Sequence, residues 1–299
     1  MSEELDELDR LFTCKNVEDV IKFYDHFDTP EQLIEWMKNR PSAPMKIYEV
    51  EGNKDIVIVI PTANHEGEFA KNCANDIFKG QQIVFVESNG PFFNYARSCN
   101  YGLKYALRYK PSWVVISNDD ITKIDPMSLL KNKLLNLNGD IISAKPTNNG
   151  HFRTSYLVKS TALFRIFNNF RRSIMARIIS NFGILYFGRT YRHKVLDMLF
   201  YKKINSLPIN SAFIIFSQRF LSSKNGNAFD EVCINSSEDL LIWLNNLTAK
   251  FAFIGVSIQD LVGSSLGNLP ARVFRDLNGL IYFNTLYKER ENYGYKNKN

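Results

Sequence analysis

Between residues 55 and 144 the sequence alternates short apolar runs with longer segments whose apolar positions have helical spacing. The runs are rich in β-branched and aromatic residues, as buried strands are, and helices of about ten to fifteen residues are expected between them. They lie at 55–60, 82–86, 113–117 and 140–144. Strands that are connected through helices form βαβ units and therefore parallel pairs. The alternation predicts an α/β fold in which helices flank a mainly parallel central sheet.

Residues 1–45 are expected to form a helical N-terminal extension. Their apolar residues recur at helical spacing among many polar ones. Thr29-Pro30-Glu31 is typical of a helix start, because proline fits the first helical position. Pro41 and Pro44 then indicate a boundary near residue 45. The sheet domain is expected over 46–270, and a helical tail over 271–299.

The net charge of +6 is unevenly distributed along the chain. Residues 1–40 hold eleven acidic and five basic residues, whereas residues 153–203 hold eleven basic residues and a single acid, Asp197. Arginines in the second stretch lie among apolar residues at helical spacing, which predicts a basic amphipathic helical insert. Such a helix can lie on an anionic membrane surface. It can equally pack on the sheet with its arginines in solvent.

Several classes of protein and site are disfavoured because their sequence patterns are missing. The sequence has no run of eighteen apolar residues and no apolar signal core, so neither a membrane span nor a leader is expected. The four cysteines are scattered and form no C-x-x-C pair, which argues against a zinc site or a disulfide framework. Glycine-rich signatures for NAD or a P-loop are also missing. We expect a cytoplasmic protein that can contact a membrane surface peripherally through residues 153–203.

Polar residues follow the predicted strands directly. Residues 61–64 follow the first strand, residues 87–90 follow the second, and Asn118-Asp119-Asp120 follow the third. The carboxyl ends of parallel strands line the edge at which open α/β sheets bind ligands. Asn118 and Asp120 are two residues apart, so on an extended backbone they face one side and can offer oxygen ligands to Mg²⁺ or Mn²⁺. The alternative is a solvated turn that caps the next element.

Short motifs follow one another over about residues 53–268 in a recognisable order. They are Ile58-Val59-Ile60-Pro61-Thr62-Ala63-Asn64, Glu87-Ser88-Asn89-Gly90, Asn94-Tyr95-Ala96-Arg97-Ser98-Cys99-Asn100-Tyr101-Gly102, Asn118-Asp119-Asp120, Asn210-Ser211-Ala212-Phe213-Ile214-Ile215, Ala228-Phe229-Asp230-Glu231, Ser237-Glu238-Asp239-Leu240 and Asp260-Leu261-Val262-Gly263-Ser264-Ser265. This order resembles the family 2 nucleotide-sugar glycosyltransferases, and the Asn-Asp-Asp form resembles their rhamnosyltransferase-like members. Three residues depart from the family pattern: Glu87 stands for Asp, Asn118 for the first Asp of the D-x-D motif, and Asp260 for His.

The resemblance implies a GT-A fold, which is Rossmann-like, and a hexosyltransferase-like activity. The family transfers a sugar with inversion from a nucleoside-diphosphate sugar to a hydroxyl of a saccharide, lipid-linked or protein acceptor, with Mn²⁺ or Mg²⁺. It implies metal ligation by Asp120, Asp119 and Asp260, and a general base at Asp239 with Glu238 as neighbour or substitute. The residues that it implies for binding the sugar nucleotide are Pro61, Thr62, Asn64, Glu66, Glu87, Asn89, Asn94, Arg97, Asn118 and Asp119.

Other interpretations of these residues stay open. Ser236 and Asp239 can form a capping box at a helix start instead of a catalytic site. Arg97 can be a surface arginine rather than a phosphate partner. The whole chain can be a non-catalytic relative that binds a membrane or nucleic acid through its basic face, although base-stacking aromatic residues are not evident. A nucleotidyltransferase is less well matched, because the loop at 62–67 carries no Lys or Arg.

Overall fold

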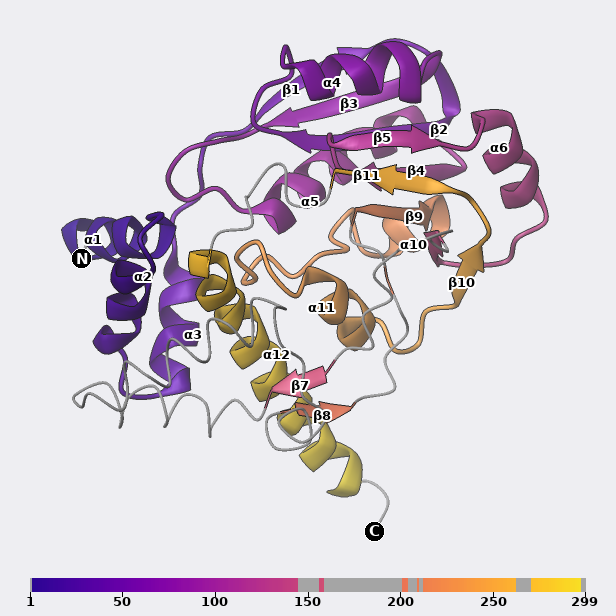
Figure 1. The fold of residues 1–299 in the computed structure, drawn as a ribbon. Coiled ribbons are helices and arrows are strands. Elements are labelled where there is room, and N and C mark those ends of the chain that lie inside the picture. Colours follow the sequence, from indigo (N-terminus) through magenta and orange to yellow (C-terminus); the bar gives the residue numbers. More distant parts are fainter. Residues whose placement is uncertain are drawn as a thin grey trace.

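A computed structural model describes residues 2–144, 156–158, 201–203, 209, 212–261 and 270–296. Its centre is a seven-stranded sheet (Figure 1). The strands, in their order across the sheet, are β1 (Lys46–Val50), β3 (Gln81–Glu87), β2 (Asn53–Thr62), β4 (Trp113–Ser117), β9 (Phe213–Ser217), β6 (Ile141–Ala144) and β10 (Phe251–Ile254). Strands β2, β3, β4, β6 and β10 run in one direction, and β1 and β9 run against them. The predicted α/β fold with a mainly parallel sheet is confirmed, and the arrangement is Rossmann-like.

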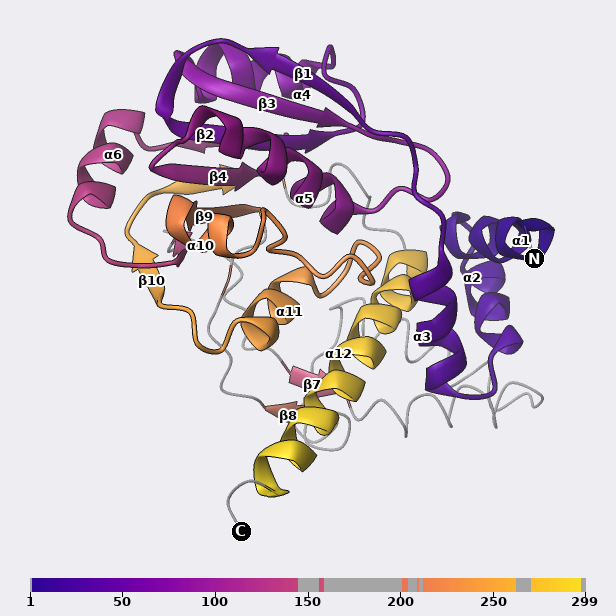
Figure 2. The same ribbon diagram turned by 180° about the vertical axis from the view of Figure 1, so that it is seen from behind.

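Helices cover both faces of this sheet (Figures 1 and 2). One face packs against α5 (Tyr95–Ala106), which the 3₁₀ turn η3 (Leu107–Tyr109) extends, and against α10 (Gln218–Ser223) and α11 (Glu238–Asn245). The other face packs against α4 (Glu68–Asn72), the π-helical turn η2 (Cys73–Ile77) and α6 (Met127–Leu135). In β2, Val57 and Val59 face the first layer, while Ile58 and Ile60 face the second. A strand that is buried on both faces is a continuous apolar run, which is why the sequence revealed it.

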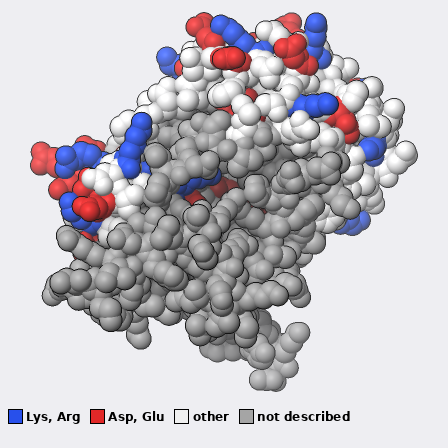
Figure 3. Space-filling model, viewed as in Figure 1, with Lys and Arg blue, Asp and Glu red and all other residues white. Residues whose placement is uncertain are grey.

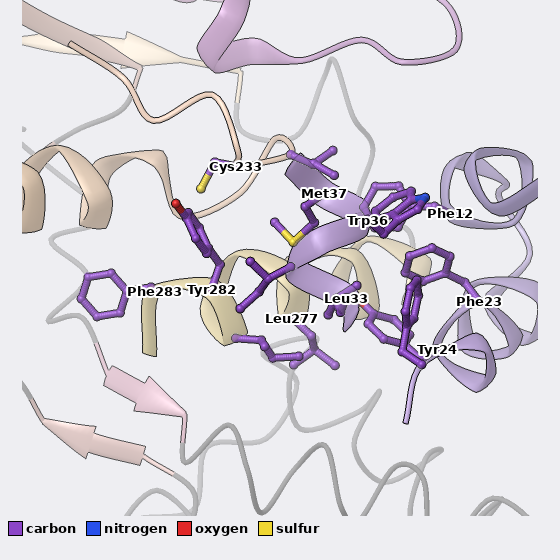
Figure 4. Packing of buried hydrophobic residues seen from close by; sticks show 14 of the residues in the cluster. Phe12, Phe23, Tyr24, Leu33, Trp36, Met37, Cys233, Leu277, Tyr282 and Phe283 are labelled. Atoms are coloured by element: carbon purple, nitrogen blue, oxygen red, sulfur yellow. The ribbon is translucent and has the colours of Figure 1, made fainter. Parts of the chain in front are cut away.

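A second apolar core joins the two ends of the chain (Figure 4). It contains residues of α1 (Ser2–Thr13), α2 (Val17–Phe23), the 3₁₀ turn η1 (Tyr24–His26), α3 (Pro30–Asn39), α11 and the C-terminal helix α12 (Pro270–Lys296). Helix α3 begins as predicted, with a capping box between Thr29 and Gln32 and Pro30 in the first turn. The core is aromatic at its centre, where the rings of Phe12, Phe23 and Trp36 contact one another at centroid distances of 4.7 to 5.4 Å.

Arg40 ties this helical region to the sheet domain. Its guanidinium forms a buried ion pair with Asp9 of α1, in which Nε donates to Asp9 Oδ1 at 2.8 Å. Its Nη1 donates to the carbonyl of Phe93, 3.1 Å away, in the loop before α5. The rings of Phe12, Trp36 and Phe92 surround the guanidinium carbon at 5.4 to 6.0 Å. Helix α3 is thus anchored to the loop that leads into the central helix.

Two small sheets complete the described structure. Strand β5 (Ile121–Ile124), directly after the β4 loop, pairs antiparallel with β11 (Ile258–Asp260). Strand β7 (Tyr156–Val158) pairs antiparallel with β8 (Tyr201–Lys203). The helical prediction for 153–203 is therefore wrong for these six residues, and the rest of that stretch lies outside the described residues. No helix in the described part of the chain is long and apolar enough to cross a membrane.

Some predicted boundaries differ from the structure for physical reasons. Strand β2 continues through Pro61 instead of ending before it, and the ladder between β2 and β4 has already ended at the pair Val59–Ile116. The missing N–H of proline therefore removes no bond on that side. The apolar stretch at 251–258 predicts a single strand from its sequence, but the structure divides it, because the chain leaves β10 and joins the small sheet as β11.

Charged side chains of both signs are interspersed on the described surface. Figure 3 shows acidic side chains on the N-terminal helices at the left of the view, with basic ones among them. The acidic surplus of residues 1–40 therefore does not form a single-sign patch on that face.

Candidate functional site

The path of the chain creates a divergence point at one edge of the sheet. From the central strand β2 the chain goes to β3 on one side and then to β4 on the other. The order of the strands therefore reverses at β2, and open α/β sheets bind ligands at the carboxyl ends of the strands beside such a reversal. Predicted site residues stand in these loops because polar, turn-forming residues follow each buried strand.

Hydrogen bonds join the loops after β2, β3 and β4. Thr62 Oγ1 donates to Asp119 Oδ2 at 2.7 Å, which links the loops on the two sides of the divergence. The Ser88 backbone N–H donates to the Thr62 carbonyl at 3.0 Å, and Asn89 Nδ2 donates to the Ala63 carbonyl at 2.9 Å. Thr62, Asn89 and Asp119, which the sequence analysis named separately, thus belong to one contiguous site.

Asp119 and Asp120 bring two partly desolvated carboxyl groups to this site. Burial raises the pKa of Asp119 above its usual value, although the bond from Thr62 opposes the shift. Among the described residues, Asp119 has no cationic side chain in ion-pair contact. Asp120 is buried, with 5% of its surface exposed. Cys73 donates its Sγ proton to the Asp119 carbonyl, and burial raises the pKa of this thiol to about 12, so it adds no charge.

The backbone of Asp260 lies next to that of Asp120. Asp260 is paired with Ile121 across the β5–β11 ladder, and the Leu261 N–H donates to the Asp120 carbonyl at 3.0 Å. The main chain therefore brings these two predicted ligands together, while the Asp260 side chain lies outside what the structure describes. The described side chains contain no group of three or more His, Cys, Asp or Glu that could hold a metal. The hard oxygen donors available to a cation are thus those of Asp119 and Asp120.

Glu87 at the end of β3 is held by a residue to which the sequence analysis gave no role. Its Oε2 accepts a bond from the His65 backbone N–H at 3.0 Å and lies 2.6 Å from His65 Nδ1. These bonds lower the pKa of Glu87. The ring of Tyr48, on β1, stacks on the His65 imidazole with a centroid distance of 3.4 Å. Neither partner could be found from periodicity, because His65 depends on the pairing of β2 with β3 and Tyr48 on the pairing of β1 with β3.

The remaining predicted residues of the loop after β2 shape the turn. Pro61 is buried within the strand, and Asn64 Oδ1 accepts a bond from the Glu66 N–H at 3.0 Å. The Asn64 N–H in turn donates to Thr62 Oγ1 at 3.2 Å. Glu66 itself is exposed. The turn therefore presents Thr62 toward Asp119 and leaves Glu66 at the surface.

Asn94 and Arg97 at the start of α5 make structural contacts. Asn94 caps the helix through Oδ1, and its Nδ2 donates to the carbonyls of Glu231 and Cys233 at 2.9 and 2.7 Å. The Arg97 guanidinium donates to the carbonyls of Arg40 and Pro41 and to Ser42 Oγ. Arg97 therefore holds the segment between α3 and β1, and this use limits its availability to a phosphate.

Glu238 and Asp239 form the first turn of α11. The alternative of a capping box between Ser236 and Asp239 does not hold: Ser237 occupies the cap position with φ of 66° and forms no capping bond, and Ser236 Oγ donates to the Asp276 carbonyl. Glu238 is buried, and desolvation raises its pKa to about 8. Its Oε1 has no hydrogen-bond partner. Asp239 is half-buried, and its Oδ1 accepts a bond from the Leu240 N–H at 2.9 Å.

Tyr95 links the strand-end loops to the turn before α11. Its hydroxyl donates to Asn118 Oδ1 at 3.0 Å, and its backbone N–H donates to Asn235 Oδ1 at 2.8 Å. Burial raises the pKa of Tyr95, and the neighbouring Cys99 and the charges of Glu238 and Asp120 add smaller contributions. The sequence analysis missed this residue because its role depends on contacts that span 23 and 140 positions of the chain.

Comparison with known proteins identifies no family for this chain. No family model matches the sequence, and no curated protein matches it. A solved structure that is similar to it is the crystal structure of A197 from STIV, with a TM-score of 0.40 and 12% sequence identity over 69% of this chain and 85% of that chain.

Proposed function

We propose that this protein is a glycosyltransferase that moves a sugar, with inversion, from a nucleoside-diphosphate sugar to an acceptor hydroxyl. The observation that carries the proposal is the hydrogen bond between Thr62 and Asp119, which joins two loops across the divergence point beside Asp120. The resemblance of the motif order to family 2 glycosyltransferases supports the choice of reaction. The α/β fold is compatible with it but hosts many other functions.

The carboxylates of Asp119 and Asp120 suit a divalent cation, Mn²⁺ or Mg²⁺. Both are hard oxygen donors, and the desolvated Asp119 carries negative charge that no described cation offsets. When bound, such a cation would stabilise the departing diphosphate as a Lewis acid. Asp260 is a candidate third ligand, since its backbone adjoins that of Asp120. Thr62 keeps Asp119 in place through its hydroxyl.

The nucleoside end of the donor is expected to lie over the loop after β3. Glu87 Oε2 is engaged by His65, so Oε1 is the oxygen that can accept a bond from a hydroxyl or N–H of the nucleoside. Asn89 fixes this loop against Ala63. We assign Asn94 and Arg97 an indirect part, because their polar atoms hold neighbouring segments of the protein.

The acceptor hydroxyl must lose a proton as it attacks the sugar, and a carboxylate within hydrogen-bond reach can take it. Glu238 is protonated at neutral pH, because burial raises its pKa to about 8. It therefore cannot accept a proton under those conditions. We assign the base to Asp239, which follows it in the same helical turn and is half-buried. Glu238 then serves as a neutral neighbour.

The test is turnover of a panel of UDP-, GDP- and dTDP-sugars with Mn²⁺ in the presence of simple saccharide acceptors. Asp239→Asn is expected to lower turnover by at least about a hundredfold, as loss of a general base does. Asp120→Ala is expected to abolish the dependence on Mn²⁺ together with turnover. Asp76→Asn, which alters an exposed acid on η2, is the matched control and should retain wild-type turnover.

Near wild-type turnover in both Asp239→Asn and Asp120→Ala would overturn the proposal. The proposal would also be overturned if no nucleotide with Mn²⁺ changed the thermal stability of the wild-type protein, while the same protein bound anionic vesicles. That outcome would identify a non-catalytic protein that contacts membranes. A lipid-linked acceptor and a peripheral membrane location through residues 153–203 remain part of the proposal.

A further inference from the structure

The contact between Tyr95 and Asn118 determines which end of the Asn118 carboxamide is available. Oδ1 of an asparagine only accepts hydrogen bonds, and Nδ2 only donates them. Tyr95 donates its hydroxyl proton to Asn118 Oδ1 at 3.0 Å, so the NH₂ group is turned to the other side. A carboxylate at this position could not be oriented in the same sense, because its two oxygens are equivalent.

Backbone hydrogen bonds hold the main chains of both Asn118 and Tyr95 in place. The Asn118 N–H donates to the Ala212 carbonyl at 3.0 Å, which fixes the main chain from which the carboxamide projects. Tyr95 is the first residue of α5, and its N–H is held by Asn235. Its ring packs edge-on against Phe229 with a centroid distance of 6.1 Å. The hydroxyl therefore points at Asn118 from a rigid support.

The Asn118 NH₂ group is free to bind a ligand. Within the described structure Nδ2 has no hydrogen-bond acceptor. Asn118 is half-buried, and its Nδ2 is not one of the unpaired polar atoms that are sealed from solvent. The group lies in the loop that carries Asp119 and Asp120. A neutral N–H donor beside two carboxylates suits an oxygen of a phosphorylated ligand better than a third carboxylate would, since a carboxylate would repel it.

We propose that Tyr95 is a positioning residue that makes Asn118 a hydrogen-bond donor to an oxygen of the nucleoside diphosphate, and that Asn118 is not a metal ligand. The inference rests on the proposed function, because it presumes that a nucleoside diphosphate binds at this edge. It accounts for the departure at Asn118, where the family pattern has a carboxylate. The oxygen can belong to a phosphate or to the ribose.

Calorimetry with UDP, GDP, dTDP and inorganic pyrophosphate, each with saturating Mn²⁺, tests the proposal. Tyr95→Phe is expected to weaken nucleotide binding by about three- to tenfold, as loss of one orienting hydrogen bond does, with Mn²⁺ affinity unchanged. Asn118→Asp should weaken binding more. In the Asn118→Asp background, Tyr95→Phe should add no further loss, because no amide is left to orient. Tyr105→Phe, which removes from the same helix a hydroxyl that donates to Glu49, is the control.

Pyrophosphate separates the two sources of the oxygen. An equal loss for pyrophosphate and nucleotides assigns the contact to a phosphate, and a loss confined to nucleotides assigns it to the ribose. Asn118→Ala provides a second measurement if Tyr95→Phe melts below the assay temperature, since it removes the donor without adding charge and should also weaken binding. Unchanged affinity in Asn118→Ala would contradict the proposal.

Three further results would overturn it. If a folded Tyr95→Phe protein bound the nucleotides with wild-type affinity, the orientation of Asn118 would not matter for binding. Tighter Mn²⁺ and nucleotide binding in Asn118→Asp would make position 118 a metal-ligand position. Both outcomes leave the proposed function standing. Failure of the wild-type protein to bind any of the four ligands would reject the proposed function and this inference together.

Discussion

Glu238 is a carboxyl group that the fold keeps out of water. Burial raises its pKa from 4.5 to about 8, and its Oε1 has no hydrogen-bond partner. Between these two pH values the native protein retains a proton that the unfolded chain has released. The free energy of unfolding must therefore fall as the pH rises from about 4.5 to about 8, and the contribution is constant above that.

Replacing Glu238 by Gln should remove this pH dependence, because the amide is neutral throughout. The variant is expected to gain stability relative to the wild type as the pH rises, by on the order of 1.4 kcal/mol for each unit of pKa shift. Urea unfolding of both proteins at pH 5, 6.5 and 8 measures the difference. Parallel stability profiles over this range would mean that the carboxyl group is hydrated in the native state.

The residue contacts at the site mark the limit of prediction from sequence. Thr62, Asn89 and Asp119 could be expected to lie together, because parallel strands end at one edge of a sheet. The contacts of Arg97 with residues 40–42 could not be expected, because they join segments more than fifty residues apart. His65 and Tyr95 were missed because their contacts with Glu87 and Asn118 depend on how the strands and helix α5 pack, which a local pattern does not specify. Local patterns identify a loop, whereas the partner of a polar side chain depends on tertiary structure.

Helix α5 is the element on which the site depends most, since it carries Tyr95, Asn94 and Arg97. It lies directly against the sheet at Gly102. A Cβ atom there would approach Val59 Cγ1 to 2.3 Å and Val86 Cγ2 to 2.7 Å. The absence of a side chain at this position therefore sets the distance between the helix and strands β2 and β3.

Gly102→Ala is expected to destabilise the protein even though alanine favours helices. Overpacking a tight core costs about 1–3 kcal/mol, while the gain in helix propensity is at most about 1 kcal/mol. Tyr101→Ala, at an exposed neighbouring position of the same helix, should change stability far less. Urea denaturation of the two variants is the measurement. A Gly102→Ala protein as stable as the wild type would show that α5 can move away from the sheet without cost.

The elements themselves were predicted to different degrees. Runs buried on both faces, such as β2, β3 and β4, were identified because apolar periodicity reports burial. Apolar periodicity does not indicate in which direction a strand runs relative to its neighbours. The antiparallel strand β9 between β4 and β6 could therefore not be predicted. The exposed edge strand β1 was missed, because five residues with partly exposed side chains show no apolar run.

At the scale of the whole molecule, the two ends of the chain form one structural unit. Helices α1 to α3 and α12 share an apolar core, which also includes residues of α11. The buried pair between Asp9 and Arg40 links this core to the loop before α5. Loss of the N-terminal helices is therefore expected to affect the site edge as well as the core.

Asp9→Asn is expected to destabilise the protein by about 3–5 kcal/mol, because it leaves the Arg40 charge buried without its counterion. The matched control is Asp19→Asn, which breaks the exposed pair with Lys22 and should change stability far less. Guanidinium unfolding monitored by tryptophan fluorescence compares the two. Equal effects of the two substitutions would indicate that water reaches Arg40 in the native state.

The opposite directions of β6 and β9 have a consequence for how such a protein could diversify. β6 ends at Ala144 and the neighbouring strand β9 begins at Phe213, beside Ser117, so both boundaries of the intervening sequence are fixed at the edge that holds Asp119. The entropy of closing a loop between two fixed points grows only slowly with its length. Residues could therefore be inserted, removed or exchanged between these strands while the sheet and the proposed donor site stay intact. Differences in length among related chains would then be concentrated between these two strands.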